Sequence, residues 1–135
     1  MSMSLFNVFS IAGSGMSAQS ARLNLTASNL ANSQSVATRP EDAYKARHPV
    51  FQTVLENESA ASVRTTGVVE SNAEAEARYS PGHPLADEKG YVYASNVNAL
   101  EEMANMMSAS RSFQQNVEVM NTSKDLLLRT LRLGD

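Results

Sequence analysis

The residues best suited to chemistry are two histidines and the acidic residues beside one of them. His48 and His83 are the only histidines, each precedes a proline, and Asp87 and Glu88 follow His83 closely. Such a group could hold a metal ion or act as an acid–base pair. However, the chain has no cysteine, and two histidines supply only half of a tetrahedral zinc site. We interpret both histidines as turn residues and expect no metal and no other cofactor.

The 18 serines raise the question of a hydrolase. Ser14, between Gly13 and Gly15, comes nearest to a nucleophile, but it lies in a helical pattern, and a Gly-x-Ser-x-Gly elbow after a strand is missing. The same segment lacks the lysine of a phosphate-binding loop. We therefore predict no enzyme and no small-molecule substrate. A small soluble enzyme that uses His83 and Asp87 stays open as the rival from another class.

The composition indicates a chain that buries part of its apolar surface against a partner. Of 135 residues, 6% are aromatic and none is tryptophan, while 18 alanines, 18 serines and 11 asparagines supply few bulky core residues. The net charge is −3, and Lys45 and Arg47 form the nearest approach to a basic cluster, so no nucleic-acid partner is expected. No stretch reaches the roughly 18 apolar residues of a membrane span, and residues 5–12 lack the preceding positive charge of a Sec signal.

Three segments must position these residues. Segment 1–38 contains one charge, Arg22, and the seven-residue apolar repeat of a helix that should stop at Arg39-Pro40. Segment 39–96 holds all four prolines and predicts a small β-rich insert, with strands at 44–55, 63–69 and 90–94 and a loop or helical turn at 71–78. Segment 97–135 begins with the capping box of Asn98 and Glu101 and predicts a helix to Gly134.

Both terminal segments carry seven-residue repeats that predict a coiled-coil pair. The fold class expected is therefore mainly α with a small β-rich insert. The helices should pack through their repeats, within one subunit or between subunits, because the C-terminal helix is too long for this chain to cover. The expected assembly residues are Phe9, Met16, Leu23 and Leu30 in the first segment, and Met103, Met106, Met107, Phe113, Val117, Met120, Leu127 and Leu131 in the last.

Several strings along the chain resemble one known family. Residues 14–24 followed by Ala-Ser-Asn-Leu-Ala-Asn at 27–32 are similar to the N-terminal signature of bacterial flagellar rod, hook and hook–filament junction proteins. The strings at 44–52, 81–87, 90–98 and 109–118 resemble a proximal-rod subunit of that family. One departure is Ser35, where the family motif usually has threonine. The motif residues carried over are Asn24, Ser28, Asn29, Asn32, Asn96, Asn98, Glu102 and Arg111.

This resemblance implies a structural subunit that polymerises helically and transmits torque from the membrane motor to the hook. It further implies export through the flagellar type III apparatus, a rod that spans the periplasm, and terminal helices forming an inner tube. The implied partners are copies of itself, other proximal-rod subunits, the hook–basal-body adaptor and the export apparatus. Another axial subunit of the same family is the nearest alternative. An amphipathic membrane-surface helix at residues 5–30 lacks the basic face that such helices carry.

Overall fold

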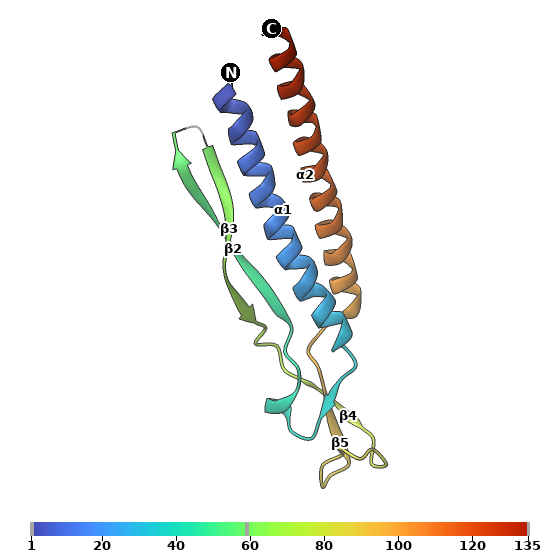
Figure 1. Ribbon diagram of the computed structural model, residues 1–135. Helices are drawn as coiled ribbons and strands as arrows, with labels where there is room; N and C mark the ends of the chain where they lie inside the picture. The colour runs from blue at the N-terminus through green and yellow to red at the C-terminus, as the bar shows by residue number, and fades with distance from the viewer. Residues whose placement is uncertain (1, 59, 135) are drawn as a thin grey trace.

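Two long antiparallel helices and a small β region make up the chain (Figure 1). The computed structural model describes residues 2–58 and 60–134, so residues 1 and 135, at the outer ends of the predicted terminal segments, lie outside the described part. The expected class, mainly α with a small β-rich middle, is confirmed. The elements are α1 (Ser2–Ala31), β1 (Val36–Ala37), the 3-10 helix η1 (Pro40–Asp42), β2 (Arg47–Asn57), β3 (Ala60–Glu70), β4 (Glu76–Tyr79), β5 (Tyr91–Ala94) and α2 (Ala99–Leu133).

Helix α1 stops at Ala31, seven residues before the predicted end. Polar side chains after the last turn take up its free carbonyls: Nδ2 of Asn32 donates to the Ser28 carbonyl at 2.8 Å, and the Ser33 hydroxyl donates to the Leu30 carbonyl at 2.8 Å. Such local bonds compete with the helical ladder. The prediction of helix up to residue 38 was therefore wrong, and Val36 and Ala37 form a short strand instead.

Helix α2 has the bounds and the N-cap that the sequence predicted. The side chain of Asn98 accepts a hydrogen bond from the Glu101 N–H at 3.3 Å, and Gly134 ends the helix. Glu101 and Glu102 lie in the first turn and Arg132 in the last, so each charge opposes the helix dipole at its end. The helix is thus specified locally at both ends.

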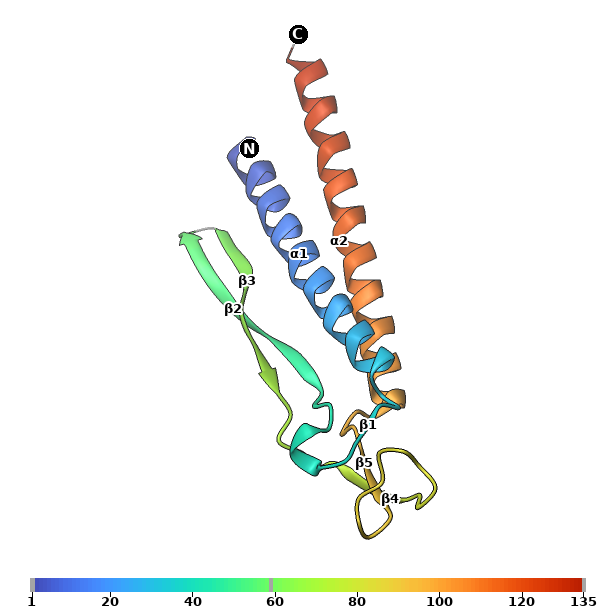
Figure 2. The same ribbon diagram turned by 60° about the horizontal axis from the view of Figure 1, so that its bottom comes forward.

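Strands β2 and β3 form a long antiparallel hairpin that lies along α1 (Figures 1 and 2). The hydroxyl of Ser14 joins the two elements, because it donates to the Ile11 carbonyl at 2.8 Å and accepts from the Val63 N–H at 3.1 Å. Small side chains, among them Ala60 and Ser62, are buried in this contact region. Ser14 is therefore a docking residue of the hairpin.

A second, three-stranded sheet has the order β1–β5–β4 and lies at the end of the molecule away from the termini (Figure 2). Residues 71–78, expected as a loop or helical turn, end in strand β4, which pairs with β5 from Glu76↔Ala94 to Tyr79↔Tyr91. Gly90 turns the chain with φ of +84°, and a Cβ there would lie 3.0 Å from the Tyr79 ring. Since β1 belongs to the first predicted segment, the sheet joins that segment to the middle one.

The buried apolar side chains of the described residues are seven alanines and one valine. Helices α1 and α2 approach closely because small residues line their contact. A Cβ built on Gly15 would lie 2.9 Å from Nδ2 of Asn116, a distance at which one of the two residues must shift. The alanine-rich core agrees with the prediction of few bulky core residues.

Candidate functional site: a polar junction between the terminal helices

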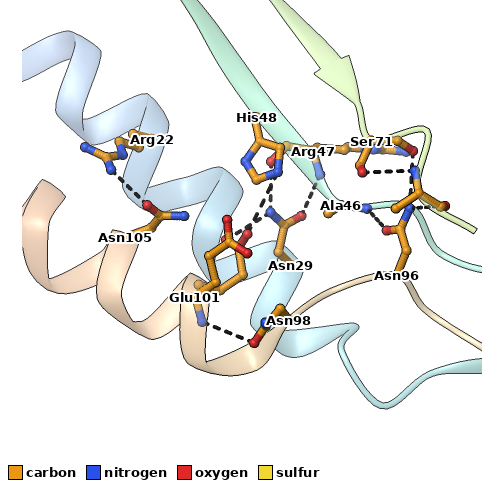
Figure 3. A network of polar contacts seen from close by, with 12 residues as sticks. Arg22, Asn29, Ala46, Arg47, His48, Ser71, Asn96, Asn98, Glu101 and Asn105 are labelled. Atoms are coloured by element: carbon orange, nitrogen blue, oxygen red, sulfur yellow. Dashed lines mark hydrogen bonds and ion pairs between the residues drawn. The ribbon is translucent and has the colours of Figure 1, made fainter. Parts of the chain in front are cut away.

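The motif residue Asn29 lies at the centre of a buried polar junction (Figure 3). Its side chain is fully buried. Nδ2 donates to the Arg47 carbonyl at 2.8 Å and to Oε2 of Glu102 at 3.1 Å. Oδ1 accepts from the Arg47 N–H at 2.9 Å and from the Tyr44 hydroxyl at 2.9 Å. Two donors and two acceptors are thereby used, so the amide joins α1, α2 and the start of β2.

Glu102 brings a buried carboxylate to the same junction. It lies in the first turn of α2, where the positive end of the helix dipole favours a negative charge. Besides Asn29, its neighbour is His48, whose Nε2 lies 4.0 Å from Oε1 and forms an ion pair with it only when the imidazole is protonated. The interpretation of His48 as a turn residue was therefore wrong, because it lies in β2, where it pairs with Val69 of β3.

Tyr44 contributes its hydroxyl to the junction, where it donates to Oδ1 of Asn29. Its hydroxyl also lies 3.2 Å from that of Ser28, a second motif residue. The Arg47 guanidinium stands 5.9 Å from the centre of the Tyr44 ring and 3.5 Å from the Glu70 carboxylate. Tyr44 and Arg47 thus hold the start of β2 against α1.

Asn96 makes a second, similar connection close to the first. Its Oδ1 accepts from the Ala46 N–H at 2.7 Å, and Nδ2 donates to the carbonyls of Ser71 at 3.2 Å and Ala73 at 2.8 Å. It therefore ties the segment before α2 to both ends of the hairpin. An asparagine amide suits this role, because it offers donors and an acceptor in one plane.

The remaining motif residues have simpler places. Asn32 and Asn98 cap the two helices, whereas Asn24 and Arg111 are exposed on α1 and α2. Arg22 is half-buried and donates to Oδ1 of Asn105 on α2 at 3.0 Å. The structure thus brings Ser28, Asn29, Asn96 and Glu102 into one region and leaves Asn24 and Arg111 outside it.

The predicted apolar columns flank the closest contact between the helices. Gly15 lies fourteen residues before Asn29 in α1, and Asn116 lies fourteen residues after Glu102 in α2. The contacts Asn29–Glu102 and Gly15–Asn116 therefore belong to one antiparallel register. The residues of α2 buried on this line are Glu102, Ala109 and Ser123, spaced by multiples of seven. Half-buried beside it are Phe9, Met16, Leu23, Leu30, Met106, Phe113, Val117, Met120 and Leu127, while Met103, Met107 and Leu131 are exposed.

His83 and Asp87 serve the turns around β4 and β5. Nδ1 of His83 accepts from the Leu85 N–H at 3.0 Å. Oδ1 of Asp87 accepts from the N–H groups of Tyr91 and Lys89, each at 2.9 Å. These bonds, that from Tyr91 foremost, hold the pKa of Asp87 below its usual range. Among the described residues, no three His, Asp or Glu side chains gather as metal ligands would.

Comparison with known proteins decides the family. Residues 9–36 match the family described as flagella basal body rod protein, and residues 88–133 match the flagellar basal body rod FlgEFG protein C-terminal family. Flagellar basal-body rod protein FlgC of an Escherichia coli strain is 50% identical over 98% of this chain and 99% of its own length. The chain belongs to the FlgC family of flagellar basal-body rod proteins.

Further FlgC proteins show the same full-length agreement. The protein of Salmonella typhi is 49% identical over 98% of this chain and 99% of its own. That of Buchnera aphidicola from Acyrthosiphon pisum is 40% identical over 98% and 100%. The FlgC family is structural, so the prediction of no enzyme is confirmed, and the rival with His83 and Asp87 falls away. Within the part of the chain that the structure describes, no helix has the length and hydropathy of a membrane span.

Some residues of the junction escaped sequence reasoning. Tyr44 and Arg47 belong to the string 44–52 that carries the resemblance, but nothing in it predicted their contact with Asn29. The contact line of Gly15, Ala109 and Ser123 carries no hydrophobic signal. Motif membership did identify Asn29, Asn96 and Glu102. The partners of their side-chain hydrogen bonds, however, lie 15 to 73 residues away in sequence, which no local pattern reveals.

Proposed function

We propose that this chain builds the proximal part of the flagellar rod, where it polymerises helically through its terminal helices and transmits torque from the membrane motor to the hook. The observation that carries the proposal is the apolar surface of α2. Leu100, Met107 and Leu131 are 79%, 67% and 61% exposed. Large apolar side chains left exposed at several points of one long helix are typical of a surface that a protein partner covers. The relatives are named flagellar basal-body rod protein FlgC, and the match covers 99% of their length.

The polar junction supports the same role by fixing the two helices relative to the hairpin. A shaft under torque needs subunits that do not change shape at each contact. Buried amide networks with all donors and acceptors used favour one arrangement over others. In this proposal the three segments 1–38, 39–96 and 97–135 act as inner helix, outer β-rich segment and inner helix.

Location and partners form the second part of the proposal. The chain is exported by the flagellar type III apparatus, and the rod that it joins spans the periplasm. Its neighbours are copies of itself, other proximal-rod subunits and the hook–basal-body adaptor. The terminal contact residues are the predicted columns that begin at Phe9 and Met106, together with the exposed Met103, Met107 and Leu131.

Deletion and complementation in the source bacterium test this function. The deletion strain should lack rods and motility, and the plasmid-borne full chain should restore both. Basal bodies isolated from the complemented strain should contain the chain in the rod, as detected by immunoblot after the rings are removed. A motile deletion strain, or a chain that stays in the cytoplasmic fraction while rods are present, would contradict the proposal.

A further inference from the structure

The three-stranded sheet turns an aromatic face to solvent at the end of the molecule away from the termini (Figure 2). Tyr79 pairs with Tyr91, so their side chains lie on the same side of the sheet, and Tyr93 follows two residues later on that side. Tyr79 is 68% and Tyr91 38% exposed, and Tyr93 is half-buried. The opposite face buries Val92. We call the three residues the tyrosine face; exposed tyrosines are typical of protein contacts.

Neighbouring residues hold the rings of the tyrosine face in place. The rings of Tyr79 and Tyr91 meet edge to face, with centroids 5.3 Å apart and planes inclined by 61°. A Cβ on Gly90 would lie 3.0 Å from the Tyr79 ring, so the turn before β5 packs against this ring. The Tyr93 hydroxyl donates to Oδ2 of Asp87 at 3.4 Å. Rings that are already held lose less conformational freedom when a partner binds.

A hollow with a volume of about 550 Å³ adjoins the tyrosine face. Its lining includes Tyr93 of β5, residues 40–45 around η1, and three alanines of the stretch that ends in β4, namely Ala73, Ala75 and Ala77. The small alanine side chains leave room above the backbone. The volume is in the range of binding pockets, so the hollow can accept a large side chain of a partner.

The hollow and the tyrosine face carry mainly negative charge. Glu41 and Glu74 line the hollow, and Lys45 is the one cationic residue among the described lining residues. A third carboxylate, that of Asp87, accepts from the Tyr93 hydroxyl. Burial, and after it the charge and hydrogen bond of Asp87 and the charge of Glu41, raise the pKa of Tyr93 above its usual range. The ring of Tyr93 thus lies among negative charges, which favour a cationic partner.

We propose that the tyrosine face and the hollow bind an arginine-containing segment of a partner protein. A guanidinium group is planar, so it stacks on tyrosine rings and donates two hydrogen bonds to one carboxylate. Glu41 already lies 3.8 Å from the Arg39 guanidinium. Glu74 is exposed and forms no ion pair with another described residue. In this proposal Glu74 receives the guanidinium, which stacks on Tyr93 in the same hollow.

The chain itself contains such an arrangement at the polar junction. The Arg47 guanidinium lies 5.9 Å from the centre of the Tyr44 ring and 3.5 Å from the Glu70 carboxylate. One arginine thus interacts with a ring and a carboxylate at once, as we propose for the arginine of the partner. The tyrosine face lies in the middle segment and not on the terminal helices. The inference therefore goes beyond the proposed rod function and does not depend on it.

NMR of the full chain tests the proposal, because its four tyrosines give few ring signals. The probe is the peptide acetyl-Gly-Arg-Gly-Arg-Gly-amide. It should shift the ring signals of Tyr79 and Tyr93 saturably, and the matched lysine peptide should bind more weakly because an ammonium group does not stack. Glu74→Gln should raise the dissociation constant about two- to fivefold, as expected for the loss of an exposed ion pair. Glu118→Gln, at an exposed position of α2, is the matched control and should leave it unchanged.

A second pair of variants separates the ring from its hydroxyl. Tyr79→Phe keeps the ring and should bind the arginine peptide as the unmodified chain does, whereas Tyr79→Ser should bind it more weakly. The Glu74→Gln result does not depend on this pair, because Glu74 forms no ion pair that the fold would lose.

Several outcomes would overturn the proposal. Absent ring shifts, or equal shifts with acetyl-Gly-Glu-Gly-Glu-Gly-amide, would show that the face does not select arginine. Equal effects of Glu74→Gln and Glu118→Gln would show that the peptide responds only to the net charge of the chain. Ring shifts on concentrating the unmodified chain without peptide would identify a second copy as the occupant. Each of these results would leave the rod function standing.

Discussion

The side chain of Asn29 pairs with the backbone of Arg47 as a neighbouring β-strand would. Its Nδ2 donates to the Arg47 carbonyl at 2.8 Å, and its Oδ1 accepts from the Arg47 N–H at 2.9 Å. One helical side chain thus satisfies both backbone groups of the first residue of β2. The same amide also contacts Tyr44 and Glu102.

Replacement of Asn29 by alanine should strongly destabilise the chain. The change leaves the Arg47 backbone groups and the Glu102 carboxylate without this partner, and each buried polar group left unsatisfied costs about 1–3 kcal/mol. Urea unfolding followed by circular dichroism should show a loss of at least about 2 kcal/mol. Asn24→Ala, at an exposed position of the same helix, is the matched control. Equal midpoints for the two variants would contradict the central role of Asn29.

Gly13 and Gly15 should respond in opposite ways to alanine. A Cβ on Gly13 meets nothing within 4 Å, so Gly13→Ala should stabilise the helix by about 1 kcal/mol through its propensity. Gly15→Ala would push against Asn116 and should gain less or lose stability. Thermal unfolding of both variants measures the difference, and Asn116→Ala should restore the gain to Gly15→Ala. The same gain for both single variants would show that the helices do not approach closely at Gly15.

Leu127→Asp should abolish assembly. Leu127 is only half-buried in the single chain, so the free subunit should tolerate the charge better than an assembled contact, which would bury it unpaired. Swarming motility and the amount of chain in isolated rods should fall to the level of the deletion strain. Asn121→Asp, at an exposed position of the same helix, should remain motile. A motile Leu127→Asp strain would show that Leu127 does not lie in the assembly contact.

His83→Ala should leave motility close to that of the unmodified protein, because the imidazole makes one local turn contact to Leu85. A non-motile His83→Ala strain with normal protein levels would show that this histidine has a role in rod function beyond the local turn. Soft-agar motility together with immunoblots provides the measurement.

The turn around Asp87 should open in acid. Since hydrogen bonds in the folded chain, first that from Tyr91, lower the pKa of this carboxyl, the contact adds stability above the usual carboxyl range. This stabilisation is lost as the pH falls through the lowered pKa of Asp87. The amide NMR signal of Tyr91 should therefore shift at acid pH and lose this titration in Asp87→Asn. An unchanged profile in that variant would show that another group causes the shift.

Local patterns predicted the two helices, the Asn98 cap and the β-rich middle, because seven-residue spacing, capping side chains and prolines act within a few residues of themselves. The predicted end of α1 was too late, and strand β4 was not predicted, since residues 71–78 were expected as a loop or helical turn. Side-chain bonds from Asn32 and Ser33 end α1 early, and pairing with β5 turns an alanine–glutamate stretch into a strand. Both effects depend on partners that periodicity does not reveal.

The sequence by itself determined the family, since 14–24 and 27–32 carry its signature, and it determined that large apolar residues would be few. The tertiary structure alone decided which residues form the closest helix contact. Small side chains such as Gly15 and Ala109 let the two backbones approach, yet they carry no hydrophobic signal. It also decided that Asn29 is the centre of the junction, because its partners meet only when two distant helices and a hairpin fold onto one another.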